Sequence, residues 1–138
     1  MPPSRAGLRV GILGGSFDPA HEGHVKISLQ ALKQFDLDQV WWLVSPGNPL
    51  KNNGPAGLDR RVKFAQEIVN HPKVKVTKIE SYLQTYYTCD TLDALKTLYP
   101  KTNFIWLMGA DNMAQMHFWK DWKYIFEIMP IGVLARPG

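Results

Sequence analysis

Short apolar runs alternate along the chain with longer stretches in which hydrophobic residues recur every three or four positions. The runs predict buried strands, and the periodic stretches predict amphipathic helices. The predicted strands are residues 8–13, 39–44, 74–79, 103–108 and 131–134. The predicted helices cover 25–35, 58–69 and 88–98, with a broken series of helical turns over 111–126. This alternation predicts an α/β fold, with a mostly parallel sheet of about five strands and helices on both faces.

Two connecting segments are predicted to be irregular. Residues 45–57 contain three prolines and three glycines, which predicts a long loop, and residues 81–87 follow neither periodicity. Parallel sheets bind ligands beyond the carboxyl ends of their strands. We therefore expect the binding residues in the segments that follow each strand, which are 14–24, 45–51, 79–91, 109–122 and 135–138.

The segment after the first strand carries the clearest chemistry. It reads GGSFDPAHEGH over residues 14–24 and opens a helix. Glycines let a ligand approach the backbone closely, and a helix N-terminus offers free N–H groups to phosphate. His21 and His24 are three residues apart, so one helical turn places both imidazoles on one side. Such a pair can donate hydrogen bonds to charge that develops on a phosphoryl group.

The same residues have a simpler interpretation, which is a capped helix start with two surface histidines. A metal site built on the two histidines lacks a third ligand at regular zinc spacing, so we expect no protein-ligated metal. The chain has no G-x-G-x-x-G after the first strand and no Walker A sequence. The hypotheses of a dehydrogenase and of a P-loop enzyme therefore lack the motif that would be their main evidence.

Composition narrows the class of protein. The 138 residues fit one domain, and 16 basic against 12 acidic residues give a net charge of +4. The basic surplus is spread evenly over both halves, which argues against nucleic-acid binding and is compatible with an anionic small molecule. Cys89, the single cysteine, is expected to be a packing residue in a reducing compartment. With no apparent signal peptide or membrane-spanning run, a cytoplasmic protein without membrane association is expected.

The chain resembles a known family at five places in the same order. Residues 14–24 resemble the GGSFDP-x-H-x-GH signature of nicotinate-nucleotide adenylyltransferases, which belong to the HxGH nucleotidyltransferase superfamily. The later segments are similar to that family's Pro-rich flap ending in Lys (45–51), its Y-T-x-D-T-L (87–92), its G-A-D with spaced tryptophans (109–122) and its R-P-G (136–138). The resemblance implies a Rossmann-like nucleotidyltransferase fold. It also implies that residues 1–138 form a single, incomplete domain, because the family's later I-S-S-T-x-x-R segment is absent.

The resemblance implies adenylyl transfer from ATP to nicotinate mononucleotide in NAD biosynthesis, with Mg²⁺ held mainly by the ATP phosphates. His21 and His24 would be catalytic. The residues that would bind the ATP phosphates are Gly14, Gly15, Ser16, Phe17 and Asp18. Those that would bind nicotinate mononucleotide are Lys51, Tyr87, Thr88, Gly109, Asp111, Trp119 and Arg136.

Several of these residues also have a purely structural interpretation. Phe17 and Trp119 are equally compatible with core positions, and Lys51 and Arg136 with the solvated surface. The residues that could serve as caps or helix starts are Asp18, Thr88 and Asp111.

Three other hypotheses stay open. The chain could be a catalytically weak or silent nucleotide-binding fragment, because it lacks the later ATP-gripping segment. It could instead prefer nicotinamide mononucleotide over nicotinate mononucleotide. It could also form a homo-oligomer, because no helix follows the last predicted strand to cover the sheet.

Overall fold

The computed structural model describes residues 7–46, 55–85 and 87–135. Within them, five strands form one sheet in the order β3-β2-β1-β4-β5, and every neighbouring pair is parallel. The strands are β1 (Arg9–Gly15), β2 (Gln39–Val44), β3 (Val74–Thr77), β4 (Asn103–Gly109) and β5 (Ile131–Leu134). The chain starts in the middle of the sheet and returns on the other side of β1, which creates a switch point between β1 and β4.

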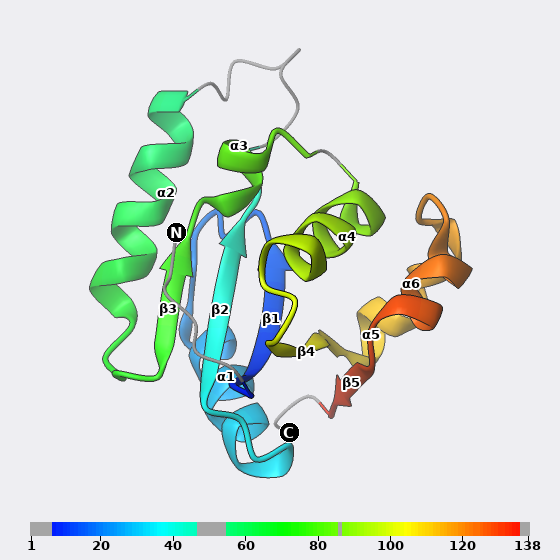
Figure 1. Ribbon diagram of the computed structural model, residues 1–138. Coiled ribbons are helices and arrows are strands. Elements are labelled where there is room, and N and C mark those ends of the chain that lie inside the picture. Colours follow the sequence, from blue (N-terminus) through cyan, green and yellow to red (C-terminus); the bar gives the residue numbers. More distant parts are fainter. Residues whose placement is uncertain (1–6, 47–54, 86, 136–138) are drawn as a thin grey trace.

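Helices cover both faces of the sheet (Figure 1). On one face lie α1 (Glu22–Gln34) and α2 (Pro55–Ile68), which pack on a core that includes Trp42. On the other lie α3 (Ile79–Leu83), α4 (Thr88–Leu98) and α6 (Trp122–Ile128), which share a core with Trp41. Between β4 and α6 the chain forms α5 (Ala110–Met113) and the 3₁₀ helix η1 (Met116–Phe118). The predicted fold class is confirmed.

Buried central strands explain the two adjacent tryptophans of β2. Successive side chains on a strand point to opposite faces, so Trp41 and Trp42 enter the two different cores. Both are fully buried, as expected for a strand with helices on each side. The indole N–H of Trp42 donates to Ser28 Oγ at 2.7 Å, and Ser28 donates to the carbonyl of His24 at 2.8 Å. This chain of hydrogen bonds fixes the first turns of α1 on the sheet.

The structure corrects two predicted boundaries. The strand predicted over 74–79 ends at Thr77, and Ile79 begins α3, so part of the segment predicted to be irregular is a short helix. This helix ends at Gln84, whose φ of 56° is left-handed. A five-residue helix has too few turns to produce a hydrophobic stripe. The loop predicted over 45–57 overlaps α2, which begins at Pro55, since proline is well accommodated in a first helical turn.

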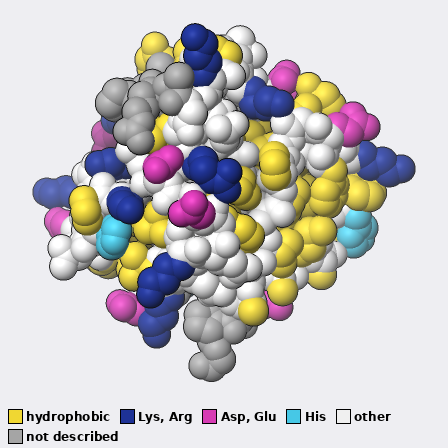
Figure 2. Space-filling view, turned by 60° about the horizontal axis from the view of Figure 1, so that its bottom comes forward, with side chains coloured by type: hydrophobic (Ala, Val, Ile, Leu, Met, Phe, Trp, Pro, Cys, Tyr) yellow, Lys and Arg dark blue, Asp and Glu magenta, His cyan; other side chains and the backbone are white. Residues whose placement is uncertain are grey.

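Exposed apolar side chains gather near η1, α6 and β5. Figure 2 shows hydrophobic side chains concentrated on one side of the face that it presents. The large exposed residues of this region are Phe118, Tyr124, Phe126 and Val133. The predicted self-association stays a prediction, which light scattering tests. Among the described residues, no helix combines the length and the apolar character needed to cross a bilayer.

Candidate active site

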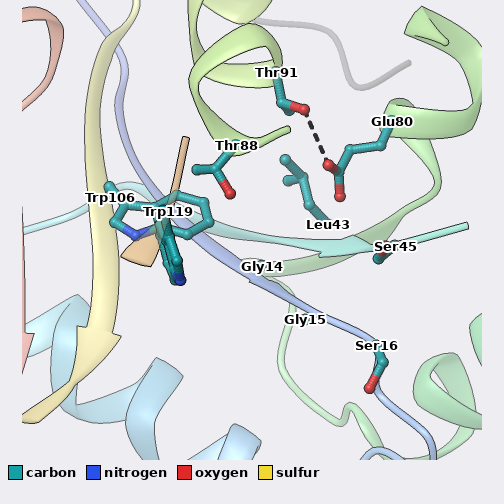
Figure 3. Close-up of a pocket in the computed structure, with 10 residues that line it drawn as sticks. All are labelled: Gly14, Gly15, Ser16, Leu43, Ser45, Glu80, Thr88, Thr91, Trp106 and Trp119. Atoms are coloured by element: carbon teal, nitrogen blue, oxygen red, sulfur yellow. Dashed lines mark hydrogen bonds between the residues drawn. The ribbon is translucent and has the colours of Figure 1, made fainter. Parts of the chain in front are cut away.

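A pocket of about 300 Å³ opens at the carboxyl ends of β1, β2 and β4, next to the switch point (Figure 3). This is the edge of a parallel α/β sheet at which ligands bind. Its lining comes from three strands, the residues that follow two of them, two helices and the segment after η1. The lining residues are Gly14, Gly15, Ser16, Leu43, Ser45, Glu80, Thr88, Thr91, Trp106 and Trp119.

The first glycine of the motif is required by packing. A Cβ on Gly14 would stand 2.6 Å from Cη2 of Trp106, whereas a Cβ on Gly15 would make only an ordinary contact of 3.6 Å with Phe17. The Trp106 ring therefore occupies the space that a side chain at Gly14 would need. Because Trp106 also lines the pocket, Gly14 fixes the position of one pocket wall.

The histidine pair stands at the start of α1. His21 is the N-cap, and its Nδ1 accepts a hydrogen bond from the N–H of Gly23 at 3.1 Å. His24 Nδ1 accepts from the N–H of His21 at 3.0 Å, and the two ring centroids are 4.0 Å apart. Beneath them, Phe17 is buried with its ring 4.5 Å from His24 and 4.9 Å from Trp42. The two rings are therefore held side by side by the backbone of their own helix turn.

These hydrogen bonds determine which ring nitrogen carries the proton. A neutral imidazole has one N–H, and an Nδ1 that accepts leaves the proton on Nε2. Burial, and then the charge of neighbouring His21, lower the pKa of His24 to about 4. At neutral pH His24 is therefore an uncharged ring that presents an Nε2–H donor. This is the type of group that can stabilise an anion without itself being a strong base.

This low pKa has a consequence for stability. Between pH 6.5 and about 4 the unfolded chain binds a proton at position 24 that the folded chain does not bind. The free energy of unfolding should therefore fall as the pH falls through that range. We expect the fall to be shallower in His24→Asn, which has no such proton, and urea unfolding at several pH values measures it. Equal pH dependence in both proteins would contradict the assignment.

Arg61 of α2 ties together two of the loops that border the pocket. Its Nη1 donates to the carbonyl of Ser16 and to that of Ser45, both at 2.7 Å, and its Nη2 donates to Pro46 at 3.4 Å. Ser16 follows β1 and Ser45 follows β2, and both line the pocket. The guanidinium fork can serve several acceptors at once, which a lysine cannot do in a fixed geometry.

Removing this clamp should loosen the pocket. We expect Arg61→Met to lower the free energy of unfolding by about 1.5–3 kcal/mol, the range for a lost charged hydrogen bond, and to raise the KM for ATP, the substrate that the sequence resemblance implies. The matched control is Arg60→Met, because Arg60 is exposed on the same helix. Urea unfolding and steady-state kinetics measure both effects. If the two variants behaved equally, the hydrogen bonds of Arg61 would not be what holds the two loops in place.

Next to Gly14, aromatic rings form a further wall of the pocket. Trp119 packs edge-on against Trp106, with ring centroids 6.1 Å apart. Trp106 is buried, and its Nε1 is the buried side-chain polar atom for which the described residues provide no hydrogen-bond partner. A buried donor without a partner costs about 1–3 kcal/mol, so such atoms call for an explanation. Its place in the pocket wall makes Trp106 a candidate donor to a ligand.

Comparison with known proteins agrees with this arrangement. The family model described as cytidylyltransferase-like matches residues 12–137. A protein of a Ruegeria species, named as a probable nicotinate-nucleotide adenylyltransferase, is 62% identical over 131 residues, which cover 95% of this chain and 69% of the relative. The chain belongs to the nicotinate-nucleotide adenylyltransferase family.

A second relative carries the same family name, and a solved structure shares the fold. The Ruegeria pomeroyi protein of the same name is 58% identical over the whole chain, which spans 65% of its length. The Plasmodium falciparum nicotinic acid mononucleotide adenylyltransferase, solved in complex with NaAD, has a TM-score of 0.72 and 16% identity over 95% of this chain and 76% of that chain. This adenylyltransferase chain thus spans about two thirds of the length of its curated relatives, and the distant structure supports its fold.

The structure brings many of the predicted site residues of this adenylyltransferase together. Gly14, Gly15, Ser16, Thr88 and Trp119 all line the one pocket. The histidine pair and Phe17 stand just beyond it, on the turn that leads into α1. The predicted roles of these residues in binding ATP and the mononucleotide stay predictions.

Other predicted residues lie further out. Asp18, Tyr87 and Asp111 are exposed, and Lys120 Nζ stands 4.4 Å from the centre of the Tyr87 ring. Gly109 is the N-cap of α5, with open space where a Cβ would be. The suggestion that Thr88 caps α4 is wrong, because the N-cap is Tyr87 and Thr88 is the first helical residue. Lys51 and Arg136 lie outside the described residues.

Sequence reasoning missed several residues of the site. Glu80, Thr91 and Ser45 fall in segments expected to hold binding residues, but no role is predicted for them. Thr91 and Ser45 also lie in segments that resemble the family, whereas nothing in the local pattern singles out Glu80. Trp106 falls in the buried strand predicted over 103–108, and it is buried, yet it also forms a pocket wall. Arg61 lies outside those segments altogether, on the outer helix α2.

Proposed function

We propose that this chain transfers the adenylyl group of ATP to nicotinate mononucleotide, which forms deamido-NAD and releases pyrophosphate. Membership of the adenylyltransferase family supports the reaction class. One observation carries the assignment to this site. A single pocket joins the glycine turn after β1, next to the histidine pair, to the start of α4 and the tryptophan wall. The two nucleotides require a pocket with one end that binds phosphate and another end that is aromatic.

The geometry favours catalysis by positioning and charge stabilisation. The attacking group is the phosphate of the mononucleotide, which is already anionic, so the site needs no strong base. His21 and His24 present Nε2–H donors where negative charge grows on the ATP phosphates and on the departing pyrophosphate. Their Nδ1 atoms are held by backbone N–H groups, so the donors are in place before the reaction begins.

The other end of the pocket suits a pyridine ring with a carboxylate. Thr88 begins α4, whose first N–H groups have no partner within the helix and favour an anion. Trp119 offers an aromatic surface for the ring, and the buried N–H of Trp106 is a further donor in the wall. We propose that the mononucleotide binds with its pyridine between these groups and its phosphate toward the histidines.

We propose that Mg²⁺ enters with the ATP phosphates. The described residues contain no group of three or more His, Cys, Asp or Glu side chains that could hold a metal ion. The donors near the glycine turn are N–H groups, which suit phosphate oxygens and leave the metal to phosphate and water ligands. When bound, the ion would neutralise phosphate charge, and the residues of this chain would orient the two nucleotides.

Calorimetric titration of the folded chain tests this proposal. We expect saturable binding of nicotinate mononucleotide and of ATP with Mg²⁺, and weaker binding of nicotinamide mononucleotide, whose neutral amide gains less from the start of α4. The fragment hypothesis predicts binding of the mononucleotide with little binding of ATP. Absence of binding of both nucleotides by folded protein would contradict the proposed function.

A further inference from the structure

Glu80 has no part in the mechanism described above, yet it lies in the wall of the same pocket. It is the second residue of α3, and its carboxyl group points into the pocket beside Thr91 (Figure 3). Of the described residues that line the pocket, Glu80 alone is ionisable. An acidic group is unexpected there, because both proposed substrates are anions.

The contacts of Thr91 indicate the protonation state of Glu80. Thr91 Oγ1 lies 3.0 Å from Glu80 Oε2, 2.8 Å from Thr85 Oγ1 and 3.2 Å from the carbonyl oxygen of Tyr87. Three hydrogen bonds need three protons, and the two threonine hydroxyls supply two of them. The carbonyl of Tyr87 can only accept. Each contact has its own proton when Glu80 is neutral and donates to Thr91, whereas an ionised Glu80 would have to share the single proton of Thr91 with the carbonyl of Tyr87.

The surroundings of Glu80 do not favour a charge. β2 and α4 pack against α3, and they contribute the apolar Leu43 together with Thr88 and Thr91 to the pocket around Glu80. Burial raises the pKa of Glu80, and it outweighs the lowering that a hydrogen bond from Thr91 to the ionised carboxylate would bring. A neutral acid is therefore consistent with both the hydrogen bonds and the environment.

The charged residues of these elements have other partners. Just before α3, Lys78 pairs with Asp59 of α2 at 3.0 Å. On α4, Asp93 accepts from the hydroxyl of Tyr124, and Lys96 donates to the carbonyl of Ile128, the last residue of α6. The other titratable group of α3 is Tyr82, which is exposed. The others of α4 are Asp90, which is exposed, and Cys89, which is buried and whose Sγ lies 3.8 Å from Asp90 Oδ1. Among the described residues, no cation stands against Glu80 to stabilise its ionised form.

We propose that Glu80 is a specificity-determining residue whose neutral carboxylic acid lets the pocket accept the anionic pyridine carboxylate of nicotinate mononucleotide. The proposal rests on the proposed function of this site. An ionised Glu80 in the same pocket would repel the ligand carboxylate, and this repulsion is strong where little water screens it. When nicotinate mononucleotide binds, Glu80 therefore keeps its proton or takes one up. Binding of nicotinamide mononucleotide, whose amide is uncharged, does not depend on this proton.

The test compares the two mononucleotides by calorimetry from pH about 5 to about 9, a range that spans raised carboxyl pKa values. The ratio of their Kd values cancels the titration of the phosphate that they share. We expect the preference for nicotinate mononucleotide to weaken with rising pH, by up to about tenfold per pH unit for one coupled proton. Glu80→Gln should remove this dependence, because its amide stays neutral and can still donate to Thr91. Its folding can be checked by circular dichroism.

A second measurement needs no ligand. The ¹³C shift of the Glu80 carboxyl, assigned by its loss in Glu80→Gln, should titrate above the ordinary value of 4.5, and Thr91→Val should change its midpoint. A midpoint at or below 4.5 would overturn the inference. A pH-independent Kd ratio with clear binding would overturn it and leave the proposed function standing. Absence of binding of both mononucleotides at every pH would overturn the proposed function and, with it, this inference.

Discussion

Replacing His24 with Asn should lower kcat for adenylyl transfer by about 10²–10³, the usual cost of one preorganised donor to a developing negative charge. Asn can still accept the hydrogen bond from the N–H of His21 near the position of Nδ1. It has no donor at the position of Nε2, so the turn should keep its shape and lose the donor that is proposed to contact the phosphates. Steady-state kinetics with saturating nucleotides measures this loss.

The matched variant is His24→Gln. Its amide can place a donor near the position of Nε2, but it gives up the acceptor that orients the ring. We therefore expect an intermediate kcat, with a larger loss of stability than in His24→Asn. If His24→Asn kept the kcat of the unmodified chain, His24 would be a structural part of the turn and its catalytic assignment would be wrong.

The second large effect is expected from Gly14→Ala. The new Cβ would lie 2.6 Å from Cη2 of Trp106, a buried ring in the wall of the pocket. Overpacking of this kind costs about 1–3 kcal/mol and displaces the residues around it. Because Trp106 forms a wall of the pocket, we expect both a lower free energy of unfolding and a higher KM for nicotinate mononucleotide. Urea unfolding and steady-state kinetics measure the two effects.

Two further variants isolate the clash. Gly15→Ala should keep nearly the original stability, because its Cβ meets only ordinary contacts. Trp106→Phe should restore stability in the Gly14→Ala background, since phenylalanine lacks the part of the ring that the Cβ meets. If the two substitutions were simply additive, the contact between Gly14 and Trp106 would not be the cause.

The regular elements could be predicted from the sequence because the strands are short apolar runs and the longer helices are strongly periodic. The strands at 39–44 and 131–134 and the helix at 88–98 have the predicted bounds. The short helix α3 could not be predicted, because five residues between a strand and a turn show no period. Local pattern therefore predicts the sheet and the long helices well, and it predicts the short connections poorly.

The features of the site also differ in how well the sequence predicts them. The spacing of His21 and His24 predicts that the rings share a side, which the structure confirms. It does not show that backbone N–H groups hold both Nδ1 atoms, since that depends on the conformation of the turn. Arg61 reaches the carbonyl of Ser16 across 45 positions of sequence, and Glu80 meets Thr91 across 11. Contacts between separate elements leave no local pattern to detect.

The reaction itself tests the central claim most directly. Folded chain incubated with ATP, Mg²⁺ and nicotinate mononucleotide should release pyrophosphate and form deamido-NAD in equal amounts, with His24→Asn as the matched control. We expect product formation to depend on the mononucleotide and to fall by about 10²–10³ in the control. If folded chain formed no deamido-NAD, or if the control formed it at the same rate, the proposed role of this pocket would be contradicted.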